Sequence, residues 1–281
     1  IILFGIRNTV NVGAKIIQIL KSFRTSSFIT TLIIHDTMNP IKLTHTLLIC
    51  LATWSAHGET LPNMVFLMTD DQGWGDVGYN GHPKIKTPHL DAMAKTGVVF
   101  NRFYASAPVC SPTRASVMTG RHPFRVNVPN HGHYLRPHET TVAEALGSAG
   151  YVTGHFGKWH IGSVQKESPT SPGGAGFDEW LSGLNFFDND PYLSRNGEYG
   201  QFKGPGSVIA MDATIEFLRK HVKGDKPIFA VTWFPSPHDP QSELPQGLPN
   251  AATLYNDEDT KKPGYFREIT LLDQQIGKLR K

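Results

Sequence analysis

The stretch "NMVFLMTDD", residues 63–71, decides the fold class. It is a short apolar run that ends in two acidic residues, and it predicts a buried parallel strand over residues 64–68 with Asp70 and Asp71 at its carboxyl end. A second run of the same kind, "KPIFAVTWF" at residues 226–234, leads into a turn that contains His238. Strands of this composition are buried on both faces, which requires helices on both sides of the sheet.

Between the two strands, turn and cap signals divide the sequence into alternating helices and strands. Helices are expected from Thr87-Pro88 through Ala94 with a stop at Gly97, from Ser111-Pro112 to Gly120, and over residues 140–150 and 207–222. Further strands are expected at residues 98–106 and 151–157. We therefore predict an α/β fold with a mostly parallel sheet flanked by helices on both faces. Ligands of such sheets bind beyond the carboxyl ends of the strands.

The first 58 residues differ in character from the rest of the chain. Residues 1–37 show no sustained period and are expected to lie outside the domain. Residues 38–58 have the layout of a signal peptide: one lysine, an apolar core at residues 47–54, and small residues before a cleavage site that precedes Glu59. A buried first helix is the alternative. Because the apolar core is too short for a membrane span, we expect an exported protein with its domain at residues 59–281. Its destination would be periplasmic, extracellular or lysosomal, depending on the organism.

The charge balance gives no reason to expect nucleic acid as a partner. The whole chain carries a net charge of +3, but residues 1–58 hold five basic side chains and one acidic side chain. The remaining residues hold 22 basic and 23 acidic side chains and are close to neutral. The 27 glycines and 20 prolines indicate many turns and long connections, which suit an α/β enzyme better than a helical bundle.

Cys110 lies in "APVCSPTRASVMTGR", residues 107–121, and is the single cysteine outside the expected signal, which contains Cys50. A helix that begins here presents free N–H groups and the positive end of its dipole, which attract anions and favour a thiolate. Arg114, four residues further on, adds a fixed positive charge on the same helix face. The stretch therefore suits an anionic oxygen substrate. The alternative is a small buried cysteine without chemistry.

Three other places carry candidate chemistry. The adjacent carboxylates of Asp70 and Asp71 repel one another unless a cation lies between them, and oxygen ligands suit Ca²⁺ or Mg²⁺. A solvated turn is the alternative for this pair. Lys158 and His160 in "GHFGKWHIG" share one face of an extended segment, where the lysine can hold an anion and the histidine can move a proton. His238, taken alone, is better explained as a turn histidine.

These segments together resemble the type I sulfatases, which are formylglycine-dependent, arylsulfatase-like enzymes of the alkaline-phosphatase-like superfamily. "CSPTRASVMTGR" resembles the Cys-x-Pro-x-Arg signature of that family, followed by Thr-Gly-Arg. Five further segments match the family pattern in the expected order: "PNMVFLMTDDQGWGDVGYNG", "TPHLDAMAKTGVVFNRFYAS", "GYVTGHFGKWHIG", "GFDEW" and "PIFAVTWFPSPHDP". The resemblance runs from about Pro62 to the end of the chain, and it implies an alkaline-phosphatase-like fold.

The resemblance implies that Cys110 is converted to formylglycine by a formylglycine-generating enzyme. The hydrated aldehyde would then be the nucleophile that attacks the sulfur of a sulfate ester. Asp70 and Asp71 resemble two of the metal ligands of the family, and together with the modified Cys110 they would hold a divalent cation. That cation is usually Ca²⁺, with Mg²⁺ as the alternative, and it would polarise the sulfate.

The same resemblance implies roles for four further residues. Arg114 would hold the hydrate in place, and Lys158 would bind the sulfate and the nucleophile. His160 would act as the base that helps break down the hemiacetal, and His238 would act as an acid near the leaving oxygen. The implied activity is hydrolysis of sulfate esters, on a sulfated small molecule or a sulfated polysaccharide. A formylglycine phosphodiester or phosphonate hydrolase and an inactive, unmodified remnant are the alternatives.

Part of the family pattern finds no match in this chain. The second pair of metal ligands, Asp-Asn or Asp-His before a glycine, and a second active-site lysine are not matched. The apolar stripe of the last 17 residues predicts a helix that is interrupted by the end of the chain; it consists of Tyr265, Ile269, Leu272, Ile276 and Leu279. We therefore expect the chain as given to bind metal poorly and to show little activity, and the complete gene product to be active.

Overall fold

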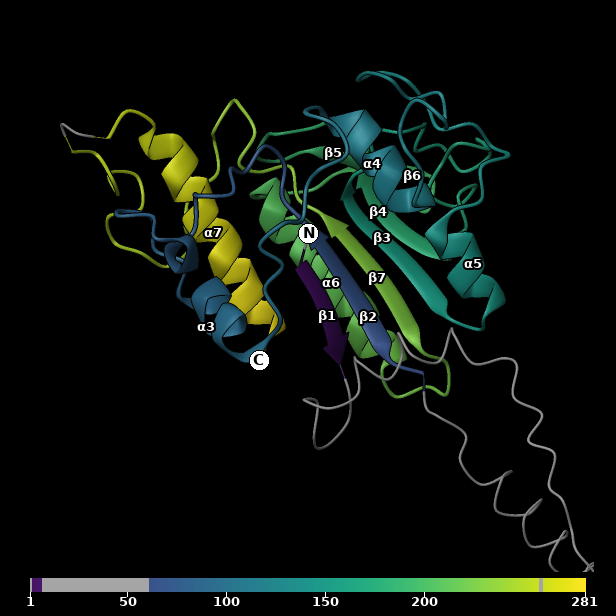
Figure 1. The fold of residues 1–281 in the computed structure, drawn as a ribbon, viewed down its shortest axis with the longest axis horizontal. Helices are drawn as coiled ribbons and strands as arrows, with labels where there is room; N and C mark the ends of the chain where they lie inside the picture. Colours follow the sequence, from purple (N-terminus) through teal and green to yellow (C-terminus); the bar gives the residue numbers. More distant parts are fainter. Residues whose placement is uncertain (1, 7–60, 258–259) are drawn as a thin grey trace, which may run out of the picture. The chain divides into compact units, whose positions relative to one another are not determined.

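The structure is a computed structural model that describes residues 2–6, 61–257 and 260–281 (Figure 1). The chain divides into two units, one made of Ile1–Gly5 with Asn63–Lys281 and the other of Ile6–Pro62. The second unit lies almost wholly outside the described residues, and so does the signal peptide expected at residues 38–58.

A seven-stranded sheet runs through the first unit in the order β1-β2-β7-β3-β4-β5-β6 (Figure 1). Its centre is parallel and consists of β2 (Asn63–Met68), β7 (Ile228–Trp233), β3 (Val152–Lys158) and β4 (Glu179–Gly183). β5 (Tyr192–Arg195) and β6 (Glu198–Gln201) extend one side with antiparallel pairing, and β1 (Ile2–Ile6) lies at the opposite edge. The mostly parallel sheet confirms the predicted fold class and the three strands expected near residues 64–68, 151–157 and 226–234. β1 falls in a segment for which the sequence predicts no element.

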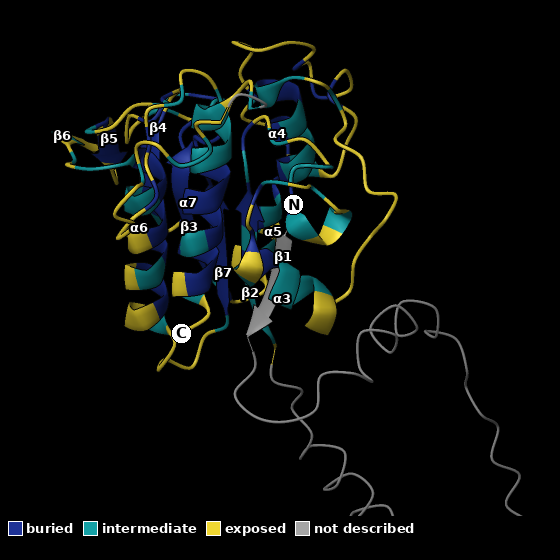
Figure 2. Ribbon diagram, turned by 90° about the vertical axis from the view of Figure 1, so that its left-hand side faces the viewer, coloured by how far each residue is buried: buried dark blue, intermediate teal, exposed yellow. Residues whose placement is uncertain are grey.

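Helices cover both faces of this sheet (Figures 1 and 2). One face carries α3 (Pro88–Thr96), α6 (Gly206–His221) and α7 (Pro263–Leu279), and the other carries α4 (Cys110–Thr119) and α5 (Val142–Ser148). Each face of the sheet packs against its helices in a hydrophobic core, and alternate side chains of β7 belong to one core or the other. Ile228 and Ala230 join the core beneath α6 and α7, whereas Phe229 and Val231 join the core beneath α4 and α5. None of the helices in the described part of the chain is long and apolar enough to cross a membrane.

The starts of α5 and α4 differ in how far a local sequence signal determines them. α5 begins at a capping box in which the Thr141 side chain accepts from the Glu144 backbone and the Glu144 carboxylate accepts from the Thr141 backbone. α4 begins at Cys110, one residue before the predicted Ser-Pro start, and its N-cap residue Val109 offers no side-chain cap. The Ser111 hydroxyl instead donates to the His160 backbone oxygen at 2.6 Å, which ties the start of α4 to the end of β3.

The strand predicted at residues 98–106 does not form. This segment runs from α3 to α4 over the surface, and Phe100, Phe103 and Tyr104 are 65%, 57% and 79% exposed. Alternating β-branched and aromatic residues form a strand when a neighbouring strand offers its backbone. No strand in the described part of the chain pairs with residues 98–106, so the pattern alone does not produce one.

Candidate active site

A polar cluster lies beyond the carboxyl ends of the central strands, where the first turn of α4 also lies. Asp70 follows β2 by two residues, Lys158 is the last residue of β3, and His238 lies in the turn after β7. Cys110 opens α4, and Arg114 follows one turn later on the same helix. Three strands and one helix N-terminus thus deliver five of the predicted site residues to one place, as expected for a parallel sheet.

The carboxylate of Asp70 is the centre of the cluster, and only 4% of this residue is exposed. Lys158 Nζ donates to Oδ2 of Asp70 at 2.5 Å, and Arg114 Nη2 lies 3.1 Å from Oδ1. Arg114 Nη1 also donates to the backbone oxygen of Lys158 at 2.9 Å, so that the two cations are fixed relative to one another. Both are fully desolvated, with 1% of Arg114 and none of Lys158 exposed.

The charges of this cluster determine what it attracts. Burial opposes ionisation of Asp70, but Arg114 and Lys158 hold the pKa of its carboxyl below the ordinary value. Burial and the neighbouring Arg114 lower the pKa of Lys158, and Asp70 acts in the opposite direction. Two buried cations around one buried carboxylate leave an excess of positive charge, and a water-excluded positive site favours an anion.

The environment of Cys110 corrects the expectation of a thiolate. Its Sγ lies 3.5 Å from Lys158 Nζ, and the residue is partly buried. Burial first, and then the Asp70 carboxylate, raise the pKa of the thiol, although Lys158 and Arg114 act against them. The two cations do not prevail because burial of the thiol and the neighbouring carboxylate outweigh them. The unmodified sulfur is therefore a neutral thiol, which is a poor nucleophile.

The ligand atoms of Asp70, Cys110 and His238 lie within 4.8 Å of one another. Asp71, the fourth candidate, places its Oδ2 3.4 Å from His238 Nε2, and its side chain is 56% exposed. The two carboxylates suit a hard divalent cation, whereas a thiol sulfur does not. With an oxygen in place of the sulfur at residue 110, this residue and the two carboxylates would all offer oxygen ligands. The donor set therefore fits the predicted cation only when Cys110 is converted to formylglycine.

His238 is held by an aromatic side chain that the sequence did not single out. Its ring stacks on Phe187, with ring centroids 3.9 Å apart and planes 13° apart. Lys158 Nζ lies 4.3 Å from the centroid of the same Phe187 ring. His238 Nδ1–H donates to the Asp239 backbone oxygen at 2.6 Å, which leaves Nε2 on the side of Asp71. An isolated phenylalanine carries no sequence signal of such a role.

His160 lies beside the cluster but does not share a strand face with Lys158 as predicted. β3 ends at Lys158, and His160 has a φ of 53°, so the extended alternation stops between them. Burial, followed by Lys158 and Arg114, lowers the pKa of His160 to about 4. The imidazole is therefore neutral at pH 7, and its buried Nδ1 has no hydrogen-bond partner within the described residues. A neutral ring can accept a proton, as the predicted base must.

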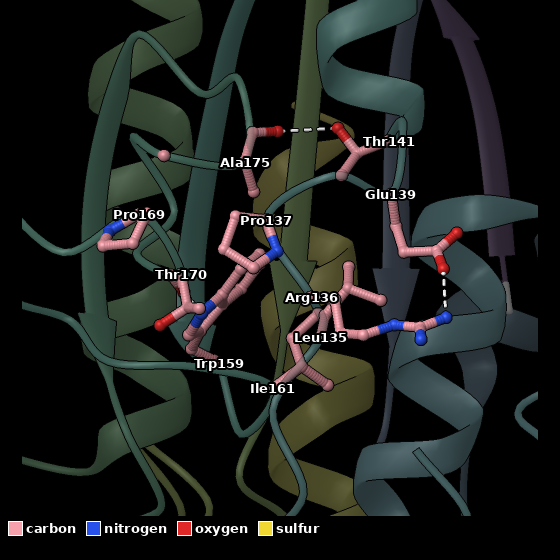
Figure 3. Close-up of a pocket in the computed structure, with 11 residues that line it drawn as sticks. Leu135, Arg136, Pro137, Glu139, Thr141, Trp159, Ile161, Pro169, Thr170 and Ala175 are labelled. Atoms are coloured by element: carbon pink, nitrogen blue, oxygen red, sulfur yellow. Dashed lines mark hydrogen bonds and ion pairs between the residues drawn. The ribbon is translucent and has the colours of Figure 1, made fainter. Parts of the chain in front are cut away.

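A separate pocket lies under the connection from α4 to α5 and shares no residue with the cluster (Figure 3). Its charged groups face one another: Arg136 Nη2 donates to Glu139 at 2.8 Å. The Thr141 hydroxyl donates to the Ala175 backbone oxygen at 2.6 Å on another wall (Figure 3). These groups hold the connection in place, and we assign the chemistry to the Asp70 cluster.

The fold and the cluster define an α/β protein with two buried cations around one carboxylate at the carboxyl edge of its sheet. The Sulfatase family model matches residues 62–281, and the chain therefore belongs to the sulfatase family. The strands and the cluster described above all lie inside the matched range, β1 excepted.

Similarity to individual proteins agrees with this family. The chain is 33% identical over 245 residues to the ulvan-active sulfatase of Formosa agariphila, which covers 79% of this chain and 47% of that protein. It is 43% identical over 126 residues to arylsulfatase A of Homo sapiens, covering 43% of this chain and 25% of that protein. The crystal structure of Ps i-CgsB in complex with k-i-k-neocarrahexaose superposes with a TM-score of 0.68 at 26% identity, over 76% of this chain and 53% of that one. The chain thus spans about half the length of these relatives or less.

Proposed function

We propose that this chain carries the nucleophile and anion-binding part of an enzyme that hydrolyses sulfate esters. The observation that carries the proposal is the pair of buried cations, Arg114 and Lys158, fixed around Asp70 next to Cys110. A sulfate ester brings one negative charge and several acceptor oxygens, which match this excess of positive charge. Membership of the sulfatase family supports the same reaction.

Each side chain of the cluster has a task in that reaction. Lys158 Nζ is 3.5 Å from Cys110 Sγ, so it can contact both the attacking atom and a sulfate oxygen. Arg114 has its guanidinium 4.9 Å from the centroid of the Trp233 ring, and this packing fixes the cation beside the first turn of α4. His238 Nε2 points toward the cluster and can hold a proton for the leaving alcohol. Neutral His160 can take up a proton as sulfate is released.

Two groups of the proposal come from the family resemblance and from the donor set. Formylglycine at residue 110 would supply a hydrated aldehyde whose oxygen attacks sulfur and whose second hydroxyl restores the aldehyde as sulfate leaves. Ca²⁺, or alternatively Mg²⁺, would be held by Asp70, Asp71 and the oxygen at residue 110, and would polarise the sulfate. The neutral state of the Cys110 thiol agrees with a role in which the residue does not act as a thiolate.

The substrate class, the partners and the location are further parts of the proposal. A sulfated carbohydrate is favoured because one relative is named an ulvan-active sulfatase and the Ps i-CgsB structure is a complex with k-i-k-neocarrahexaose. A formylglycine-generating enzyme would be the partner that modifies Cys110. Export through the signal peptide expected at residues 38–58 would bring the domain to an extracellular, periplasmic or lysosomal substrate.

Mass spectrometry of the peptide that contains Cys110 tests the proposal, after co-expression with a formylglycine-generating enzyme. Formylglycine is about 18 Da lighter than cysteine, and the loss should disappear in Cys110→Ala. An intact thiol after co-expression would overturn the mechanism. Aryl sulfate and aryl phosphodiester are then compared as substrates for the chain and for a version extended to the length of its relatives. Faster turnover of the phosphodiester would move the assignment to the alternative hydrolase class.

A further inference from the structure

We propose that Tyr265, on the first turn of α7, is a positioning residue that sets the cation affinity of the site. It would do so by fixing the loop at residues 71–76, which carries Asp71. This inference rests on the proposed function, because the cation site is part of that function. Tyr265 contacts none of the reacting groups directly. Its action would pass through the backbone of the loop, 189 to 194 residues away in the sequence.

The phenol oxygen of Tyr265 is the meeting point of this loop. The Gly73 backbone N–H donates to it at 3.0 Å. The hydroxyl lies 2.6 Å from Asp76 Oδ2 and 3.2 Å from the Asp71 backbone oxygen. A phenol has one proton to donate. The Asp76 carboxylate is a nearer and stronger acceptor than the Asp71 backbone oxygen. Tyr265 therefore donates to Asp76 and accepts from Gly73, and so it bridges the two ends of the turn.

The loop itself is closed tightly around these contacts. The Asp76 backbone N–H donates to the Gly73 oxygen at 3.1 Å, and the Gly73 N–H also approaches Asp76 Oδ2 at 3.0 Å. A Cβ atom at residue 73 would meet Asp76 Oδ2 at 2.4 Å, so only glycine allows the carboxylate to lie there. The turn and the phenol thus form one hydrogen-bonded unit.

Asp71 depends on this unit more than its neighbour Asp70 does. Asp70 is buried and held by two cations. The Asp71 side chain is 56% exposed, and among the described residues its carboxylate has only the 3.4 Å approach to His238. Its φ of 62° is in the left-handed region, which a non-glycine residue keeps only when its surroundings hold it there. The direction of its carboxylate is therefore set by the backbone of the loop, and a preformed ligand direction raises affinity.

The test compares Tyr265→Phe with Tyr255→Phe as the matched control. The Tyr255 hydroxyl also links α7 to a distant loop, through Thr270 and the Lys86 backbone, but it does not contact residues 71–76. The unsubstituted protein and each variant are prepared with isotope labels, extended to the length of the relatives and co-expressed with a formylglycine-generating enzyme, so that Cys110 is converted. CaCl₂ is titrated into each of them and followed by the amide resonances of Asp70 to Asp76. We expect Tyr265→Phe to weaken Ca²⁺ binding by about tenfold and Tyr255→Phe to leave it unchanged, since one charge-assisted hydrogen bond is at stake. Gly73→Ala should weaken binding with the phenol in place, which gives a second route if Tyr265→Phe unfolds.

Each outcome decides the matter. Equal Ca²⁺ affinity for Tyr265→Phe and the unsubstituted chain would overturn the inference and leave the proposed function standing. An equal loss in both tyrosine variants would also overturn it, because general packing of α7 would then be the cause. If the unsubstituted chain binds neither Ca²⁺ nor Mg²⁺, the cation site and this inference both fail. The mass of residue 110 still decides the nucleophile independently.

Discussion

Replacing Asp70 by asparagine should lower the free energy of unfolding, because the Asp70 carboxylate compensates the charges of two buried cations. Asp70→Asn keeps the shape of the side chain but removes the one negative charge that lies 3.1 Å from Arg114 and 2.5 Å from Lys158. Breaking a buried ion pair typically lowers the free energy of unfolding by about 3–5 kcal/mol, because the remaining charge stays desolvated. Here two cations would remain, at 1% and 0% exposure. A loss of this size is a large part of the total stability of a domain.

The loss should also depend on pH in both directions. The folded-state pKa of Asp70 is depressed, so its contribution is complete above the unfolded value and disappears as the pH falls through the folded pKa. The two proteins should therefore become equally stable in strong acid. At high pH the variant can release the Lys158 proton, since burial and Arg114 already lower that pKa and Asp70 no longer raises it. The deficit should be greatest near neutral pH and shrink on either side.

Urea unfolding measures this deficit through the fluorescence of the buried Trp159 and Trp233. Asp212→Asn is the matched control, because Asp212 pairs with Lys278 at the surface, where both side chains are about half exposed. Such a pair contributes about 0–1 kcal/mol. A deficit below about 1 kcal/mol for Asp70→Asn at pH 7, equal to that of the control, would refute the argument that Asp70 compensates two desolvated cations.

Three further predictions concern other parts of the structure. Burial raises the pKa of Glu268 to about 8, so the folded chain keeps a proton that the unfolded chain loses. Stability should therefore fall from about pH 5 to 8, and Glu268→Gln should flatten that slope in urea midpoints, whereas parallel curves would contradict the assignment. Thr141→Ala removes the cap of α5 and the bond to Ala175, and should lower the free energy of unfolding by about 1–2 kcal/mol; an unchanged urea midpoint would count against it. Phe187→Leu should remove the upfield ring-current shift of the His238 ring protons, Phe187→Tyr should retain it, and identical spectra would disprove the stacking.

How far the fold could be predicted depended on where each strand lies in the sheet. The strand at residues 228–233 is buried on both faces and the strand at residues 63–68 is buried or partly buried, so hydrophobicity alone identifies them. Residues 98–106 have the same kinds of side chain, yet they remain on the surface, because pairing depends on a partner that a local pattern does not contain. β5 and β6 were not predicted, since each has only four residues and mixed polarity.

Some residues of the site can be located from sequence motifs and sheet topology, whereas others depend on contacts between distant segments. Cys110 and Arg114 are one helical turn apart. Asp70 and Lys158 lie at the carboxyl ends of β2 and β3, on either side of β7, so motif and topology together locate these residues. Phe187 reaches the site from the loop after β4, and no sequence motif indicates its role there. Tyr265 was assigned to an apolar stripe, whereas its hydroxyl bonds to the loop that carries Asp71.

The properties of Cys110 show why position and partner must be considered together. A helix start with an arginine one turn later predicts a thiolate when the two are considered alone. Burial of the thiol reverses that result and raises its pKa, and the Asp70 carboxylate adds to this effect because it repels a second anion at sulfur. The same carboxylate lies 3.1 Å from Arg114 and 2.5 Å from Lys158, and so it offsets the charges of two side chains that have almost no contact with solvent. The cluster therefore keeps an excess of positive charge beside a thiol that stays neutral, which is the arrangement expected if the nucleophile is an oxygen made from this residue.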